Sequence, residues 1–312
     1  MRKPLPFFLI LALTAAHVAC AQKDATSRSW NQPVEPFKIA GNLYYVGASD
    51  IAAFLVATPD GLILLDGGFE ETAPLIRASV EKLGFHLKDV KFLLNGHAHL
   101  DHAGGLAALK EGSGAKLLAS AKDTPALERG GHGDFRFGDT MTFPPVKVDR
   151  QVQDGERLTL GGTTLVAHLT PGHTQGCTTW TARIADGGKT LDAVFVCSTS
   201  ILPGDRLTGN PKYPGMAADY THSLAVLKAL PCDLFLGVHG NFFDLAGKAA
   251  RLRAGEKTNP FVDPAGYREY LAQAEAKLTR QLAEEKAAQA PKPGAGASTN
   301  KPAASSSSIS SD

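Results

Sequence analysis

Apolar and polar positions alternate with two different periods along the chain, and together they predict an α+β protein. In the first half, short apolar runs predict strands, and an amphipathic stretch that stops at Gly84 predicts a helix over residues 72–83. Pro59-Asp60-Gly61 predicts the turn of a hairpin between two of these strands. A second helix is expected over 103–109. The strands are expected at 43–45, 52–57, 62–65, 90–94 and 116–119.

The second half repeats the order of strands followed by helices. Residues 150–197 carry mostly β-type patterning, interrupted by Gly161-Gly162 and Asp186-Gly187-Gly188. Two successive halves of this kind predict two sheets stacked face to face with helices outside. A charged segment, 263–287, can form one or two terminal helices. The other elements are expected as strands at 157–160, 163–168, 178–184, 191–197 and 233–238, and as helices at 217–230 and 245–253.

The two ends of the chain differ from this central domain. Residues 1–21 have a basic start, an apolar core too short to span a bilayer and the small-residue sequence Ala19-Cys20-Ala21, which together predict a secretory signal peptide and a periplasmic mature protein. A lipoprotein signal ending at Cys20 is the alternative, which His17 disfavours. Residues 288–312 are rich in Ala, Pro, Gly and Ser, without aromatic residues, and are expected to be a disordered tail. This leaves one domain over 22–287.

Composition narrows the range of partners. Among 312 residues, basic and acidic side chains nearly balance, with a formal net charge of +1, so nothing indicates a nucleic-acid partner. After the N-terminal segment no stretch is long and apolar enough to span a membrane. We therefore expect a monomer that acts on a small molecule.

The residues with the most chemical information lie between Asn95 and Gly105. Three histidines and an aspartate fall within six residues directly after an apolar run. In an extended continuation of a strand, His97 and His99 project to the same side and can bind one metal ion. Asp101 and His102 follow where the chain turns into a helix, so they can serve a neighbouring ion. The alternative is a solvated, histidine-rich turn, which this density of ligands disfavours.

Further ligands are available at isolated positions. His173 lies in a turn between two strand-like runs, and His239 follows an apolar strand and precedes a glycine. Each alone would more often be a structural histidine, but every candidate ligand follows the end of a β-run, where a sheet can present its loops to one rim. His132 could reach a substrate from a glycine-rich loop, although an exposed loop histidine is the favoured interpretation.

These motifs give the chain a clear resemblance to subclass B3 of the metallo-β-lactamases. The resemblance covers about residues 30–252, and it includes the segments 30–37, 95–105, 171–174, 209–214 and 238–245. It implies an α+β protein with an αββα sandwich, the metallo-β-lactamase fold. It also implies two Zn²⁺ ions per chain. The first zinc would be bound by His97, His99 and His173, and the second by Asp101, His102 and His239.

The resemblance also implies a reaction. A zinc-bound hydroxide would attack the β-lactam amide of penicillins, cephalosporins or carbapenems, with Asp101 orienting the nucleophile, and the activity would confer antibiotic resistance. Ser198 and Ser200 resemble paired serines of the subclass that hydrogen-bond water or the substrate carboxylate. Equally, they could be strand-end hydroxyls that satisfy the backbone. Substrate preference would depend on the loops around 130–143 and 201–214.

Related activities remain as alternatives. Thioesterases and lactonases of this fold bridge their metals with an aspartate in the strand after the Gly-His-Thr turn, but residues 194–200 contain no carboxylate. A zinc-binding protein without activity is the third possibility, disfavoured by the complete ligand set. Relatives in the subclass carry a disulfide that would here join Cys177 to Cys197. Cys232 would then be a free, buried thiol.

Overall fold

The computed structural model describes residues 27–289. The predicted signal peptide and residues 290–312 of the predicted tail lie outside the described residues. Residues 288 and 289, which the composition places in the tail, belong to the last helix instead. In the described part of the chain, no helix combines the length and the apolar character needed to cross a membrane.

The first half of the chain builds a seven-stranded sheet in sequence order. Strands β1 to β4 pair antiparallel, and β4 to β7 pair parallel. The parallel strands β4 and β5 consist almost entirely of apolar residues because helices cover this part of the sheet. The strands are β1 (Phe37–Ala40), β2 (Leu43–Tyr45), β3 (Phe54–Thr58), β4 (Gly61–Leu65), β5 (Val90–Leu94), β6 (Lys116–Ser120) and β7 (Arg150–Val152).

The second half builds a five-stranded sheet in the order β12-β11-β10-β9-β8. Strands β8 to β11 pair antiparallel, and β12 adds parallel to β11. The strands are β8 (Arg157–Leu160), β9 (Thr163–Leu169), β10 (Thr178–Asp186), β11 (Lys189–Val196) and β12 (Leu234–Gly237).

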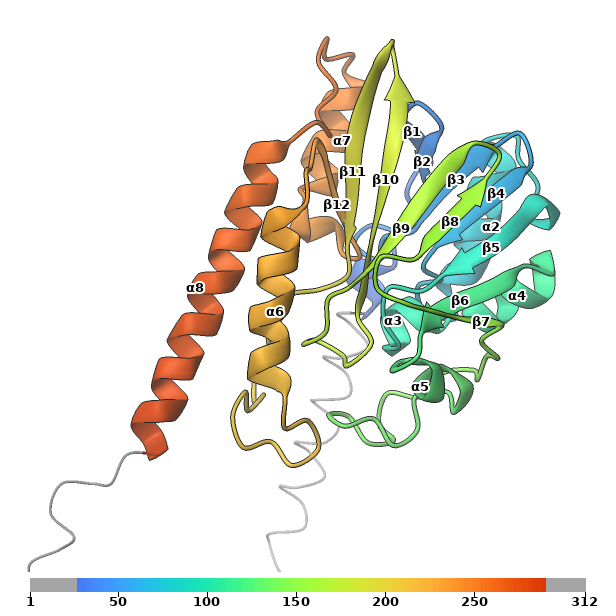
Figure 1. Ribbon diagram of the computed structural model, residues 1–312. Helices are drawn as coiled ribbons and strands as arrows, with labels where there is room; N and C mark the ends of the chain where they lie inside the picture. Colours follow the sequence, from blue (N-terminus) through green and yellow to red (C-terminus); the bar gives the residue numbers. More distant parts are fainter. Residues whose placement is uncertain (1–26, 290–312) are drawn as a thin grey trace, which may run out of the picture.

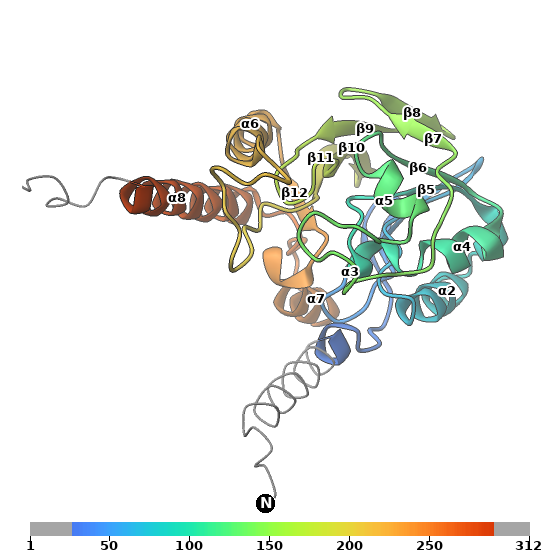
Figure 2. The ribbon, with the colours of Figure 1, turned by 90° about the horizontal axis from the view of Figure 1, so that it is seen from below.

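The two sheets face each other, and helices cover their outer faces (Figures 1 and 2). Phe54 from one sheet and Phe195 from the other meet in the apolar core between them, with ring centroids 5.2 Å apart. The helices α2 and α4 cover the first sheet, and α6 and α8 cover the second. The helices are α2 (Thr72–Lys82), α3 (Leu100–Ala103), α4 (Leu106–Ser113), α5 (Thr124–Glu128), α6 (Met216–Ala229), α7 (Leu245–Arg253) and α8 (Pro264–Gln289), with short 3-10 turns at Leu87–Asp89 and Gly240–Phe242.

The sequence-based prediction of an αββα sandwich is therefore confirmed, and the differences are local. The short elements β1, β7 and α5 were not predicted, because three to five residues carry too little periodicity to stand out. The single helix expected over 103–109 is divided into α3 and α4 at Gly104-Gly105. A side chain at Gly105 would collide with the carbonyl oxygen of Gly67, so the glycine permits the close approach of this turn to the end of β4. The segment 263–287 forms one helix, α8.

A disulfide joins Cys177, just before β10, to Cys197, just after β11, as expected. Cys232 is the free cysteine of the described residues, but it is only partly buried, which corrects the expectation of a buried thiol. The position follows α6 beside an exposed proline, where the chain runs along the surface. Burial still raises the pKa of the Cys232 thiol to about 12, so it is a poor nucleophile at neutral pH.

We expect alkylation of the unreduced, denatured protein to modify Cys232 and to leave Cys177 and Cys197 unmodified, because only thiols react. Mass spectrometry of peptides with and without prior reduction checks this, and the reduced sample is the control that all three sites can be labelled. Labelling of Cys177 or Cys197 without reduction would contradict the pairing.

Candidate metal centre

Six side chains with metal-binding chemistry meet at one end of the sandwich, although they come from both halves of the chain. Each follows a strand end or begins the next helix, as the sequence pattern predicted. His97 and His99 follow β5, Asp101 and His102 lie in α3, His173 lies in the turn between β9 and β10, and His239 follows β12.

The first cluster consists of His97, His99 and His173. Their ligand nitrogens all lie within 4.8 Å of one another, and Nδ1 of His99 is 3.1 Å from Nε2 of His173. The extended backbone from β5 projects His97 and His99 to the same side, and their ring centroids are 4.8 Å apart. Nδ1 of His173 donates to the carbonyl of Ser200 at 2.8 Å, which leaves Nε2 of a neutral ring free for a ligand bond.

The second cluster is centred on the carboxylate of Asp101. Its Oδ2 lies 3.3 Å from Nε2 of His102 and 3.5 Å from Nε2 of His239. Nδ1 of His239 is hydrogen-bonded to Asp50 at 2.9 Å, so this second carboxylate orients the ring toward Asp101. The two clusters adjoin, because ligand atoms of His97, Asp101 and His102 also lie within 4.8 Å of one another.

The protonation states suit a cation in this place. Burial lowers the pKa of His97 and His99 well below the usual value, and it lowers the pKa of His173 to about 4. These rings are therefore neutral at pH 7 and able to donate lone pairs. Burial opposes ionisation of Asp101, but His102 and His239 beside it hold its pKa well below the usual value. Burial likewise opposes protonation of His239, yet Asp101 and Asp50 raise its pKa to about 9, so His239 is protonated without a metal and a bound cation would displace that proton.

Buried ring nitrogens without a hydrogen-bond partner indicate whether these residues fit a bound metal ion. Nε2 of His97, Nε2 of His99 and Nδ1 of His102 are buried and have no hydrogen-bond partner among the described residues, and Nε2 of His102 has only its 3.3 Å contact with Asp101. Buried polar atoms without partners are destabilising, and several of them within two adjoining groups of possible metal ligands are explained by a bound ligand. Several neutral imidazoles with a carboxylate are the donor set of a transition-metal site. The residues present thus fit bound metal ions.

Two buried aspartates hold the turns that carry these side chains. Asp66 follows β4 in a left-handed conformation (φ 60°), and its Oδ1 accepts from the backbone N–H of Gly96 at 2.7 Å. Asp123 precedes α5 and joins the turn of His97 and His99 to the turn of His173. It accepts from the N–H of Ala98 at 3.0 Å, from the hydroxyl of Thr174 at 2.9 Å and from the N–H of Gly176 at 3.0 Å.

The aspartates at 50, 66 and 123 were not among the site residues predicted from the sequence. Asp66 had a visible signal, because it directly follows an apolar strand and precedes two glycines. Asp50 and Asp123 had none, because their partners are turns that lie far away in the sequence.

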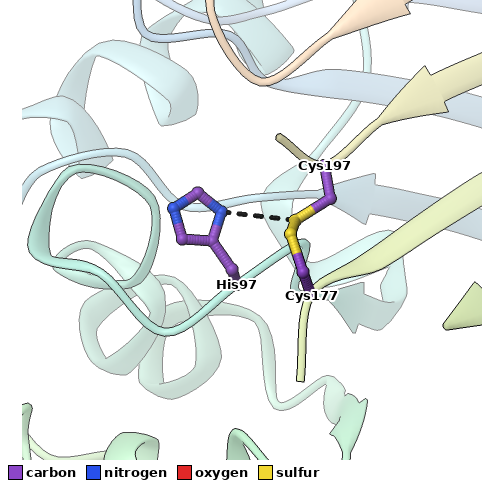
Figure 3. A group of neighbouring side chains, drawn as sticks. All are labelled: His97, Cys177 and Cys197. Carbon is purple, nitrogen blue, oxygen red and sulfur yellow. Dashed lines mark hydrogen bonds between the residues drawn. A yellow bond between two sulfur atoms is a disulfide. The ribbon is translucent and has the colours of Figure 1, made fainter. Parts of the chain in front are cut away.

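The disulfide lies against the first cluster. Sγ of Cys197 is 3.6 Å from Nδ1 of His97, on the ring edge opposite the unpartnered Nε2 (Figure 3). Ligand atoms of His97, Cys177 and Cys197 lie close enough to form a metal-binding group by distance alone, but the two sulfurs are bonded to each other. A disulfide sulfur is not a thiolate, so the bridge is not counted among the metal ligands. Its contact with Nδ1 limits the rotation of the His97 ring.

A cavity of about 420 Å³ opens over both clusters. Ser198 and Ser200 line it, as does Asp101. The Ser198 hydroxyl accepts from the N–H of Ser200 at 3.1 Å, as expected if these serines satisfy the backbone at a strand end. This bond does not use the hydroxyl proton of Ser198. His132 is exposed beside Asp139 and does not line the cavity. The remaining lining residues are mostly apolar and include Trp30, Phe69, Phe137 and Phe242.

Comparisons with known proteins agree on the family. A profile described as the metallo-beta-lactamase superfamily matches residues 46–239. Among solved structures, the native FEZ-1 metallo-beta-lactamase from Legionella gormanii is 44% identical, with a TM-score of 0.80 over 82% of this chain and 98% of that one. BJP-1, a subclass B3 metallo-beta-lactamase of Bradyrhizobium japonicum, is 41% identical, with a TM-score of 0.77 over 83% of this chain and 97% of that one.

Curated relatives match over shorter stretches. A hydroxyacylglutathione hydrolase from Rhodospirillum rubrum is 29% identical over 157 residues, which are 50% of this chain and 49% of that protein. The chain thus spans about half the length of such a relative.

Proposed function

Because the chain belongs to the metallo-beta-lactamase superfamily and to its subclass B3, we propose that it is a zinc-dependent β-lactamase. It would hydrolyse the amide bond of penicillins, cephalosporins and carbapenems and so confer resistance to them. The observation that carries this proposal is the convergence of five histidines and Asp101 under a cavity large enough for a small molecule.

We assign the six residues to two zinc ions. His97, His99 and His173 would hold one, and Asp101, His102 and His239 the other. The unpartnered nitrogens of His97 and His102 support this assignment. The hydrogen bonds of Nδ1 of His173 to Ser200 and of Nδ1 of His239 to Asp50 also support it, because they orient these two rings. When bound, zinc supplies a water that is acidic near neutral pH and a positive charge that polarises a carbonyl.

The protein residues would position the substrate and the nucleophile. Asp101, ionised at neutral pH, can accept a hydrogen bond from the attacking water and so hold it in line with the amide carbonyl. The Ser198 hydroxyl proton remains available to donate to the carboxylate that β-lactams carry beside the ring. The apolar walls would exclude bulk water, which strengthens these electrostatic interactions.

A thioester or lactone hydrolase is the alternative, raised by the similarity to hydroxyacylglutathione hydrolases. Two features favour the β-lactamase. Residues 194–200 contain no carboxylate to bridge two metals, and Cys197 at the end of β11 is occupied in the disulfide. The similarity to subclass B3 structures also extends over 97–98% of their chains.

The remaining assignments follow from the sequence. We propose one catalytic domain over 22–287, export to the periplasm by residues 1–21, and a monomer that acts without a nucleic-acid or membrane partner. These proposals are consistent with the single pair of packed sheets in the described residues.

Zinc removal tests the proposed function. We expect the zinc-loaded mature chain to contain two zinc ions and to hydrolyse a carbapenem, and a chelator to abolish hydrolysis because the nucleophile is then lost. Metal analysis, steady-state hydrolysis and the thermal unfolding midpoint are measured before chelation, after it and after zinc is restored. Since a ligand of the native state stabilises it, the midpoint should fall with the metal content. A folded, zinc-replete chain that cleaves thioesters or lactones but no β-lactam would refute the proposal.

A further inference from the structure

Two loops from opposite halves of the chain line the cavity and contact each other. The α5–β7 loop (129–149) contributes Phe137 and Met141, and the β11–α6 loop (197–215) contributes Leu202 and Pro203. Both loops lie at the lower end of the molecule in Figure 1, below the strand ends that carry the histidines.

Arg136 joins the two loops. Its guanidinium forms an ion pair with Asp205 and donates from Nη2 to the carbonyl of Pro203 at 2.6 Å. The two charged side chains are only 18% and 8% exposed, so this is not a solvated surface pair. The bond to Pro203 is exposed, but the shielded ion pair fixes the relative position of the two loops better than an exposed pair would.

The β11–α6 loop is the firmly held side of this contact, because helix α8 anchors it. The carboxylate of Glu285 accepts from the N–H groups of Leu207 and Thr208 at 2.8 and 2.7 Å. Gln281 donates to the carbonyl of Asp205 at 2.7 Å. The Asp205 carboxylate also accepts from the N–H of Leu202 at 2.7 Å, so it is oriented before Arg136 reaches it.

The α5–β7 loop carries the residue that this contact would position. Phe137 directly follows Arg136, and its ring centroid lies 5.2 Å from that of His99. The guanidinium carbon of Arg136 lies 5.3 Å from the centroid of the same ring. Movement of Arg136 away from Asp205 would therefore carry Phe137 away from the metal centre and widen the cavity.

We propose that Arg136 and Asp205 form a clasp that docks the α5–β7 loop onto the anchored β11–α6 loop and so determines which β-lactams fit over the metal centre. Arg136 is thus a positioning residue that acts through Phe137. The substrate part of this inference rests on the proposed function, whereas the docking of the loops does not.

A direct role for Arg136 in binding the substrate carboxylate makes a different prediction. In that case Asp205 would compete with the substrate, so its removal would leave binding unchanged or improve it. In the clasp, Arg136 and Asp205 act as one unit, and removal of either should have the same effect. Double-mutant analysis separates these cases, because residues that act only through each other are not additive.

The test uses the zinc-loaded mature protein with Arg136→Gln, Asp205→Asn and both changes together. Arg251→Gln is the matched control, because Arg251 pairs with Glu256 on the exposed surface of the α7 end, away from the cavity. The measurements are kcat and KM for one β-lactam with a small side chain and one with a bulky side chain, and amide hydrogen exchange of residues 131–143. Circular dichroism confirms folding, and Arg136→Lys tests whether a shorter, single-point cation restores the contact in part.

We expect each single variant to change KM by about tenfold and to change the ratio of KM values between the two substrates, with kcat altered less. Exchange of the loop amides should rise about tenfold or more, and the double variant should match either single variant. Unchanged loop exchange, or a KM effect confined to Arg136→Gln, would overturn the clasp. A parent protein without β-lactam hydrolysis would refute the proposed function, while the exchange data would still decide whether the loops are clasped.

Discussion

Replacing Asp101 with alanine is expected to lower carbapenem turnover by at least about 100-fold without unfolding the protein. Changes to groups that merely orient a metal ligand already cost about 10–100-fold, and Asp101 would be a ligand as well as the group that orients the nucleophile. Its carboxylate is also the contact shared by His102 and His239. Three neutral histidines would remain to hold one zinc, so only the second metal should be lost.

The experiment compares Asp101→Ala and the isosteric Asp101→Asn with Asp60→Asn, an exposed aspartate in the β3–β4 turn. Steady-state hydrolysis gives the rate, circular dichroism confirms the fold, and metal analysis counts the zinc. Loss of rate together with one retained zinc fits the two-metal assignment. If Asp101→Ala keeps its rate within a fewfold of the parent, a single-metal mechanism must replace the one proposed here.

Replacing Asp123 with alanine is expected to destabilise the fold by about 3 kcal/mol or more, since each buried donor left unpaired costs about 1–3 kcal/mol. The change would leave the N–H groups of Ala98 and Gly176 and the hydroxyl of Thr174 without a hydrogen-bond acceptor. Burial raises the pKa of Asp123 to about 6, so at neutral pH it is the ionised carboxylate that accepts all three bonds. Urea unfolding of the zinc-free protein measures the effect independently of metal binding.

Asp154→Ala provides the control for Asp123. Asp154 is exposed and also accepts a backbone N–H bond, from Leu169 at 2.9 Å. Because water can replace a partner at an exposed site, its loss should change the free energy of unfolding much less. Asp123→Asn should lie between the two, because one amide oxygen can still accept while the amide nitrogen faces a donor. Equal effects for the Asp123 and Asp154 variants would show that the buried aspartate does not hold the turns together.

The residues of the metal centre could be chosen from the sequence because each has a local signal. The period of two in β5 predicts that His97 and His99 share one side, and their ring centroids lie 4.8 Å apart. His173 and His239 could be recognised only because they repeat the same position after a strand. Which strand ends meet at one rim depends on the pairing of the sheets, which the resemblance supplied and periodicity did not.

The supporting residues could not be predicted in the same way. Asp123 accepts from Ala98 and from Gly176, which are 25 and 53 residues away. Arg136 and Asp205 lie in loops without periodicity, and either alone is an ordinary surface residue by composition. Their roles depend on the distances between turns, which no residue pattern within a single segment encodes. The division of α3 from α4 could likewise not be predicted from the sequence, because it follows from the approach of Gly105 to Gly67.

The two clasped loops of the cavity and the metal-binding turns occupy different segments of the chain. Arg136, Phe137, Leu202 and Pro203 can change without altering any residue assigned to the zinc ions. Under the proposed function, natural selection can therefore act on the range of β-lactams that the cavity admits while the residues assigned to the zinc ions are inherited unchanged. Variants selected under a new drug should accumulate their substitutions in these two loops, and the histidines and aspartates below them should remain unchanged.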